Sequence, residues 1–152
     1  MRLLFGTLLC AIAASAACGA DAAPAGLPAF RPGLWSFSLT VNRYGEKNPQ
    51  VRTMTRCADP GEEIRKKWLN LAAQACKFSP VTHTGNTYSY SSSCDSQGRQ
   101  LQMKSVIVVD SDDSYRVDSQ SHTLTQASRE IVVARRVGDC PTRSAAAPPV
   151  KE

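Results

Sequence analysis

The chain has 152 residues, of which 42% are hydrophobic, and its formal net charge at pH 7 is +5. This length suits one domain with a core of its own and argues against several domains. The basic charge suits anionic partners such as lipid headgroups, lipopolysaccharide or nucleic acid. However, no aromatic residues are interleaved with the basic ones, so we expect no nucleic-acid partner.

The first residues have the features of an export signal. Arg2 gives a thin positive start, and residues 3–17 form an apolar run that is too short to span a bilayer. The string ADA at residues 20–22 fits a cleavage site before Ala23. We therefore interpret residues 1–22 as a signal peptide; the alternative is an internal core helix.

The rest of the chain divides into three parts. We interpret residues 23–32, rich in Ala, Gly and Pro, as a linker. Residues 33–140 then form an ordered domain, and residues 141–152, rich in Ala and Pro, form a disordered tail. Removing the signal peptide leaves 17 basic and 12 acidic residues, so the charge stays at +5.

The cysteines also indicate export. The chain has six, and two of them, Cys10 and Cys18, lie in or near the signal peptide. The other four are Cys57, Cys76, Cys94 and Cys140. In an oxidising compartment, an even set of this kind predicts two disulfides. A zinc site is the competing interpretation, and the lack of any C-x-x-C pair disfavours it.

Cys18 has two possible fates. Cleavage before Ala23 removes it. Alternatively, the string SAAC at residues 15–18 is a permissive lipobox, and an acylated Cys18 would tether the domain to a membrane through residues 19–32. We expect a periplasmic protein in either form.

Alternating apolar and polar residues predict an antiparallel β fold. The clearest strand covers residues 34–41, where Trp35, Phe37 and Leu39 alternate with Ser and Thr. The other strands expected outside the central hairpin are residues 51–57, 100–109, 115–124 and 128–137.

One amphipathic helix interrupts the strands. Asp59 can act as its N-cap and Pro60 fits its first position. Ile64, Trp68 and Leu71 then recur at helical spacing. Such a helix can pack on the sheet or lie on a membrane surface, and its short apolar stripe favours packing.

Residues 76–94 predict a hairpin with a cysteine at each end. If its turn centres on Gly85, Cys76 and Cys94 face each other at a distance close to that of a disulfide. Pro80 cannot donate a ladder hydrogen bond, so its strand should be an edge strand or bulged. The same register sets these pairs: Tyr88 with Thr82, Tyr90 with Pro80, and Ser92 with Phe78.

The second disulfide depends on how the helix is placed. If the helix crosses the sheet, Cys57 and Cys140 lie together at the end opposite the hairpin cysteines. If it only caps one end, Cys140 is left alone. Four cysteines allow three connectivities, and we favour Cys76–Cys94 with Cys57–Cys140. The fold class expected is mainly β: a single antiparallel, strongly curved sheet of about seven strands, for which a half-barrel is one form, with one helix and two disulfides.

Several motifs together resemble a known family. They are RPGLW at residues 31–35, the four spaced cysteines, GN at 85–86 and RRVGDC at 135–140. They are similar to those of the domain-of-unknown-function family numbered 3617, over about residues 31–140. The resemblance implies a small exported protein of Gram-negative bacteria with no established activity. Ser36 departs from the acidic residue that members commonly carry, so a role of that acid cannot be carried over to this chain.

The sequence carries no catalytic motif, and we expect neither an enzyme nor a cofactor. The two histidines, His83 and His122, have no neighbours that form a metal site or triad. Asp110, Asp112 and Asp113 could bind calcium, but they lack the ligand spacing of a calcium loop. We therefore interpret them as a solvated turn and expect no metal.

Two non-catalytic functions remain. The protein could bind a small amphiphile on the face of Trp35, Phe37 and Leu39, unless that face is simply core. Alternatively, it could be a protein-interaction module of the envelope, such as an inhibitor or an assembly factor. Its basic charge argues against an inhibitor of basic, lysozyme-like enzymes. Arg135 and Arg136 are candidate anion contacts, and we expect a monomer.

Overall fold

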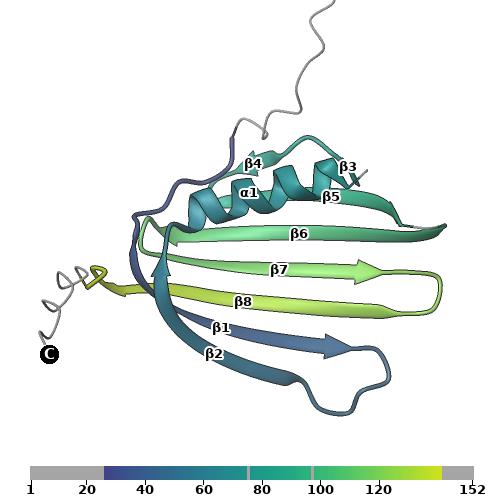
Figure 1. Cartoon of the computed structure of the whole chain (residues 1–152), viewed down its shortest axis with the longest axis horizontal. Helices are drawn as coiled ribbons and strands as arrows, with labels where there is room; N and C mark the ends of the chain where they lie inside the picture. Colours follow the sequence, from purple (N-terminus) through teal and green to yellow (C-terminus); the bar gives the residue numbers. More distant parts are fainter. Residues whose placement is uncertain (1–25, 75, 97, 142–152) are drawn as a thin grey trace, which may run out of the picture.

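The structure, a computed structural model, describes residues 26–74, 76–96 and 98–141 (Figure 1). The expected signal peptide, the possible lipidation site Cys18 and nearly all of the expected tail lie outside these residues. No helix in the described part of the chain is long and apolar enough to cross a membrane.

A single antiparallel sheet of eight strands makes up most of the domain. The elements in chain order are β1 (Gly33–Arg43), β2 (Gln50–Ala58), α1 (Pro60–Ala73), β3 (Cys76–Phe78), β4 (Thr82–Thr84), β5 (Thr87–Ser96), β6 (Arg99–Ser111), β7 (Ser114–His122) and β8 (Ala127–Gly138). The strand order is β2-β1-β8-β7-β6-β5-β3, and β4 also pairs with β5. The sheet is curved and open, with β2 at one edge (Figure 1). The expected fold class is confirmed.

Helix α1 leads from β2 at one edge of the sheet to β3 at the other. Its first turn forms as the sequence predicts: the Asp59 side chain accepts a hydrogen bond from the Glu62 amide at 3.0 Å, and Pro60 follows the cap. Trp68, on its buried side, packs against aromatic rings of β3 and β5. The helix therefore packs on the sheet.

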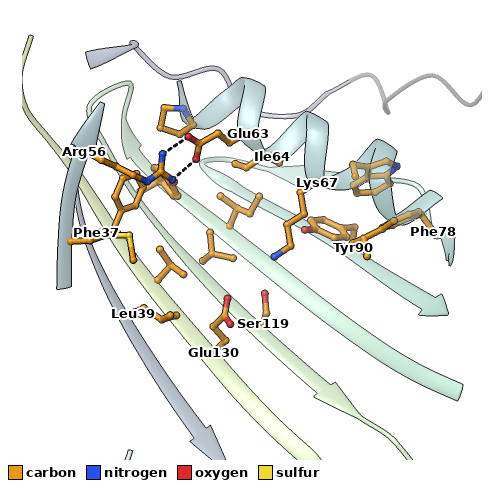
Figure 2. A pocket seen from close by; sticks show the side chains of 18 residues that line it. Phe37, Leu39, Arg56, Glu63, Ile64, Lys67, Phe78, Tyr90, Ser119 and Glu130 are labelled. Atoms are coloured by element: carbon orange, nitrogen blue, oxygen red, sulfur yellow. Dashed lines mark hydrogen bonds and ion pairs between the residues drawn. The ribbon is translucent and has the colours of Figure 1, made fainter. Parts of the chain in front are cut away.

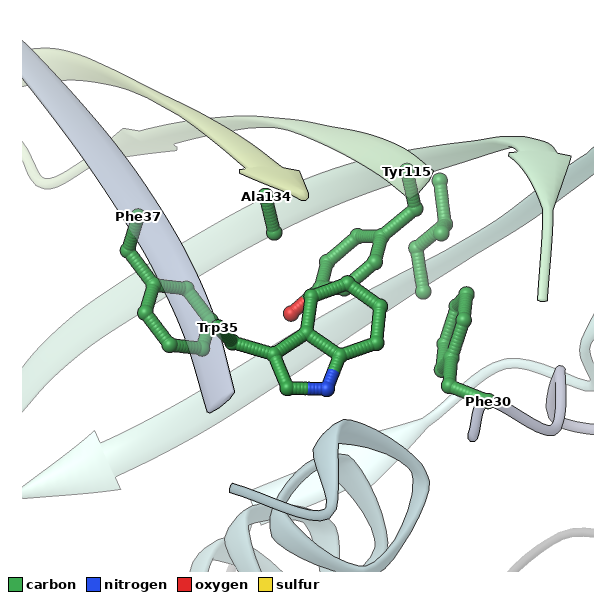
Figure 3. Close-up of a cluster of buried hydrophobic side chains, with 6 residues drawn as sticks. Phe30, Trp35, Phe37, Tyr115 and Ala134 are labelled. Atoms are coloured by element: carbon green, nitrogen blue, oxygen red, sulfur yellow. The ribbon is translucent and has the colours of Figure 1, made fainter. Parts of the chain in front are cut away.

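The hydrophobic core lies on the inner, concave face of the sheet near the start of α1 (Figure 3). Trp35 is fully buried, and its indole Nε1 donates a hydrogen bond to the Arg31 carbonyl at 3.0 Å. Phe30 and Tyr115 pack against it, with their ring centres 6.1 and 5.7 Å from that of Trp35. Phe30 comes from the segment that the sequence suggested as a linker, so the residues just before β1 help to close the core.

The central hairpin differs in part from its predicted register. Cys76 pairs with Cys94 and Phe78 with Ser92, as expected. Beyond Pro80, however, Tyr88 pairs with His83 instead of Thr82, and Tyr90 has no partner in β3 or β4. The reason is local. Pro80 interrupts the ladder between β3 and β4, and the turn occupies two residues, Gly85 with φ +61° and Asn86. This break also explains why the structure has eight strands, one more than expected.

The two disulfides join the expected partners. Cys76–Cys94 closes the base of the hairpin, and Cys57–Cys140 joins the end of β2 to the segment after β8. Cys57 lies just before α1 and Cys76 just after it. The helix is therefore covalently fixed to the sheet near both of its ends.

A pocket between helix α1 and the inner face

A cavity of about 290 Å³ lies between α1 and the inner face of the sheet (Figure 2). Alternation along the strands turns every second residue towards the pocket, and most of these inward residues are apolar. Leu39, Val117 and Val132 contribute to this floor, and Ile64 and Leu71 contribute to the roof. This arrangement can hold an apolar group of a ligand away from water.

An ion pair closes the end of the pocket near the start of α1. The Arg56 guanidinium on β2 donates two hydrogen bonds to the Glu63 carboxylate, at 2.5 and 2.7 Å. The Cζ atom of Arg56 lies 4.8 Å from the ring centre of Phe37. The hydrogen bond to Glu63 raises the pKa of Arg56. Nearby, burial raises the pKa of Tyr115 to about 12, with a smaller contribution from the Glu63 charge. The pair ties the edge strand β2 to the helix.

Aromatic rings close the opposite end. Trp68 stacks on Phe78 with ring centres 3.9 Å apart, and its ring centre lies 4.7 Å from that of Tyr90. Burial raises the pKa of Tyr90, and a hydrogen bond with Ser105 opposes this rise. Because Trp68 comes from α1 and the other two rings come from the sheet, the cluster sets the distance between the helix and the sheet at this end of the pocket.

Between these two ends, three further polar side chains interrupt the apolar lining. Figure 2 shows Lys67 running from α1 towards the sheet, with Glu130 and Ser119 on the strands below it. Glu130 is half-buried and pairs in register with Ser119. Within the described residues, neither Lys67 nor Glu130 takes part in an ion pair. The pocket therefore contains one cation and one anion that are available to a ligand.

Beyond these residues the inner face becomes rich in hydroxyls. The Ser105 and Ser119 hydroxyls lie 2.9 Å apart, and those of Ser121 and Ser128 lie 2.8 Å apart. In each pair one hydroxyl donates its hydrogen to the other, so the accepting hydroxyl keeps its own hydrogen for another acceptor. The inner face thus has an apolar part and a hydroxyl-lined part.

The residues proposed from the sequence for ligand binding are divided by the structure. Phe37 and Leu39 line the pocket, whereas Trp35 lies in the core. Lys67 and Glu130, which also line the pocket, were not predicted from the sequence. Alternation along the last strand did not indicate Glu130, because Ile131, Val133 and Val137 make the opposite parity look the more apolar.

The two candidate anion contacts have different surroundings. Arg135 is exposed, but only 13% of the Arg136 side chain is exposed. Its Nε donates to the Pro32 carbonyl at 3.1 Å, and its guanidinium pairs with Asp113 and Asp139. Arg136 therefore holds the two ends of the domain together.

The predicted acidic turn and the histidines lie outside the pocket. Asp112 and Asp113 lie 3.9 and 3.0 Å from the guanidinium of Arg31. His83 has its Nε2 2.7 Å from the Gly85 carbonyl, and His122 is exposed. Among the described residues, no three His, Cys, Asp or Glu side chains are grouped to hold a metal ion.

Comparison with known proteins gives one match. A family model described as "Protein of unknown function (DUF3617)" matches residues 30–140, which confirms the resemblance seen in the sequence. No curated protein and no solved structure matches the chain.

Proposed function

Because the chain belongs to the DUF3617 family of unknown function, we propose a function from the pocket: the protein binds a small amphiphile between α1 and the sheet and catalyses no reaction. The observation that carries this proposal is the cavity itself, an apolar space of about 290 Å³ that contains Lys67 and Glu130. Ligand sites typically combine an apolar lining with a few placed polar groups, in volumes of roughly 300–1,000 Å³. The cavity fits the lower end of this range.

The proposal includes export to the periplasm. Its support is the pair of disulfides, Cys57–Cys140 and Cys76–Cys94, because such bridges persist in oxidising compartments. Acylation of Cys18 would add a membrane tether. A mass spectrum of the protein from its native envelope tests both points, since a start at Ala23 and an acylated Cys18 give different masses.

The binding proposal is tested by filling the pocket. Val132→Trp places a large side chain inside the cavity, whereas Val133→Trp places the same side chain on the outer face, where Val133 is 47% exposed. We expect the first variant to lose binding of a dodecyl amphiphile, measured by isothermal titration calorimetry, and the second to retain it. Thermal unfolding shows whether each variant is folded. Equal binding by both folded variants would place the ligand elsewhere.

A second candidate function, a protein-interaction module of the envelope, has support in strand β2. All but the last of its nine residues are exposed, and it pairs only with β1. The other edge has two three-residue strands separated by a segment containing Pro80. Short strands and prolines protect sheet edges from pairing, and β2 has neither. A photo-crosslinking residue at Thr53 should capture one defined protein in the envelope, while one at Ser91 should not.

A further inference from the structure

We propose that the amphiphile has a single chain and a zwitterionic head, with its anionic group bound by Lys67 and its cationic group bound by Glu130. This inference rests on the proposed function and names the class of ligand.

Glu130 is the less expected of the two charges. It lies in the first half of β8, and alternation places Val132 and Ser128 on the same, inner side. Val132 is part of the pocket lining too. A half-buried carboxylate on such a surface has lost part of its hydration, and no described cation pairs with it. A ligand cation would replace the lost hydration and give this residue a role.

Lys67 differs from the other cations around the helix. Arg65 and Lys66 both pair with Glu62 along the outer surface of α1, and Arg56 is held by Glu63. Lys67 has no ion pair with another described residue and extends over the pocket (Figure 2). An ammonium group in this position suits a phosphate or carboxylate of a ligand.

The two charges lie on opposite walls, one on the roof and one on the floor, and they do not pair directly in this arrangement, since no contact of 4.0 Å or less joins them. A head group with both charges can bridge this gap. A purely anionic head would satisfy Lys67 but meet repulsion from Glu130, and a purely cationic head would do the reverse. Such like-charge contacts are an effective means of rejecting ligands.

The rest of the site agrees with this class. The apolar cavity, at about 290 Å³, is small for a ligand site and suits one chain more than two. The hydroxyl of Ser119, which lines the pocket and pairs in register with Glu130, can donate to a phosphate or glycerol oxygen. A lysophospholipid with an ammonium-bearing head group has all these features.

The test compares four dodecyl probes below their critical micelle concentrations. They are dodecylphosphocholine, which is zwitterionic, laurate, which is anionic, dodecylamine, which is cationic, and dodecyl maltoside, which is neutral. Each is titrated into the mature protein by isothermal titration calorimetry. We expect dodecylphosphocholine to bind about tenfold more tightly than laurate or dodecylamine, because only it pairs both charges.

Two variants then change the selectivity in opposite directions. Glu130→Gln should weaken dodecylphosphocholine and strengthen laurate, whereas Lys67→Gln should weaken laurate and strengthen dodecylamine, each by about five- to tenfold. The control is Lys66→Gln, which removes a neighbouring charge outside the pocket and should change no affinity. These opposite shifts cannot arise from a general loss of stability.

The outcomes separate this inference from the proposed function. Binding of all four probes with equal affinity, or a preference for laurate that Glu130→Gln does not alter, would overturn the zwitterion while leaving amphiphile binding intact. Binding of none of the four would overturn the proposed function itself. The expected ranking with both variant shifts would support the inference.

Discussion

Gly33→Ala should destabilise the domain because the start of β1 and the end of β8 meet at Gly33 with no room for a side chain. A Cβ atom at this position would lie 2.5 Å from Nε of Arg136 and 2.6 Å from the Gly138 carbonyl oxygen. The Arg136 Nε is itself held by a hydrogen bond to the Pro32 carbonyl. The close approach of Arg136 and of the Gly138 carbonyl therefore requires glycine at position 33.

The size of the effect follows from these distances. Ordinary contacts of a Cβ atom begin at about 3.4 Å, so the Gly138 carbonyl must move by about 0.8 Å. This carbonyl belongs to the pairing between β1 and β8, which has a register shift at Leu34 and Trp35. Overpacking of this kind costs roughly 1–3 kcal/mol. We expect a loss near the middle of that range, since the Arg136 hydrogen bond must also adjust.

Urea unfolding followed by tryptophan fluorescence measures this loss, because Trp35 is fully buried beside the junction. The control is Gly138→Ala at the same junction, where an added Cβ meets nothing within 4 Å. Its free energy of unfolding should stay within about 0.5 kcal/mol of the unaltered protein. Equal destabilisation by both substitutions would refute the steric argument, as would full stability of Gly33→Ala.

Three further predictions concern the disulfides and the shifted pKa values. Replacing Cys57 and Cys140 with Ser should lower the free energy of unfolding by about 4.5 kcal/mol, because this disulfide joins residues 83 positions apart. Replacing Cys76 and Cys94, which are 18 positions apart, should lower it by about 3 kcal/mol. Equal losses for the two double variants in urea unfolding would contradict the loop-length argument. Hydrogen bonds from Arg129 lower the pKa of Asp118, so this pair stabilises the fold above the unfolded-state pKa and less as pH falls through the folded-state pKa. Asp118→Asn should therefore reduce stability slightly at neutral pH and have no effect in strong acid, as thermal unfolding at several pH values can check. Burial raises the pKa of Tyr115 from 10.0 to about 12. The neutral phenol therefore contributes fully to stability below pH 10, and this contribution is lost as the pH rises towards 12. Tyr115→Phe should remove this alkaline loss of stability in the same thermal unfolding assay.

Patterns of short range predicted most of the secondary structure. Alternation gave the strand at Trp35 and Phe37, and the Asp59 cap with Pro60 gave the start of the helix. Both features depend on neighbours in sequence, which is why they can be read locally. The hairpin register beyond Pro80 could not be read in this way, because it depended on where the ladder breaks and on how many residues the turn contains.

The candidate site was harder to predict than the fold. It could be predicted that the side chains of Phe37 and Leu39 face inward, and both line the pocket. Trp35, on the same face, lies in the core because Phe30 and Tyr115 cover it. Alternation shows which face a residue occupies, but only packing decides whether that face is closed or leaves a cavity.

The strand periodicity, the helix with its cap and the cysteines that are placed to pair could all be predicted, because each follows from spacing along the chain. Packing between distant segments places Lys67 and Glu130 in one pocket and commits Arg136, unlike Arg135, to ion pairs within the domain. These features could not be predicted because helix α1 lies over strands distant from it in the sequence. The distance between its side chains and those of β7 and β8 depends on how the curved sheet and the helix pack together, which no local pattern encodes.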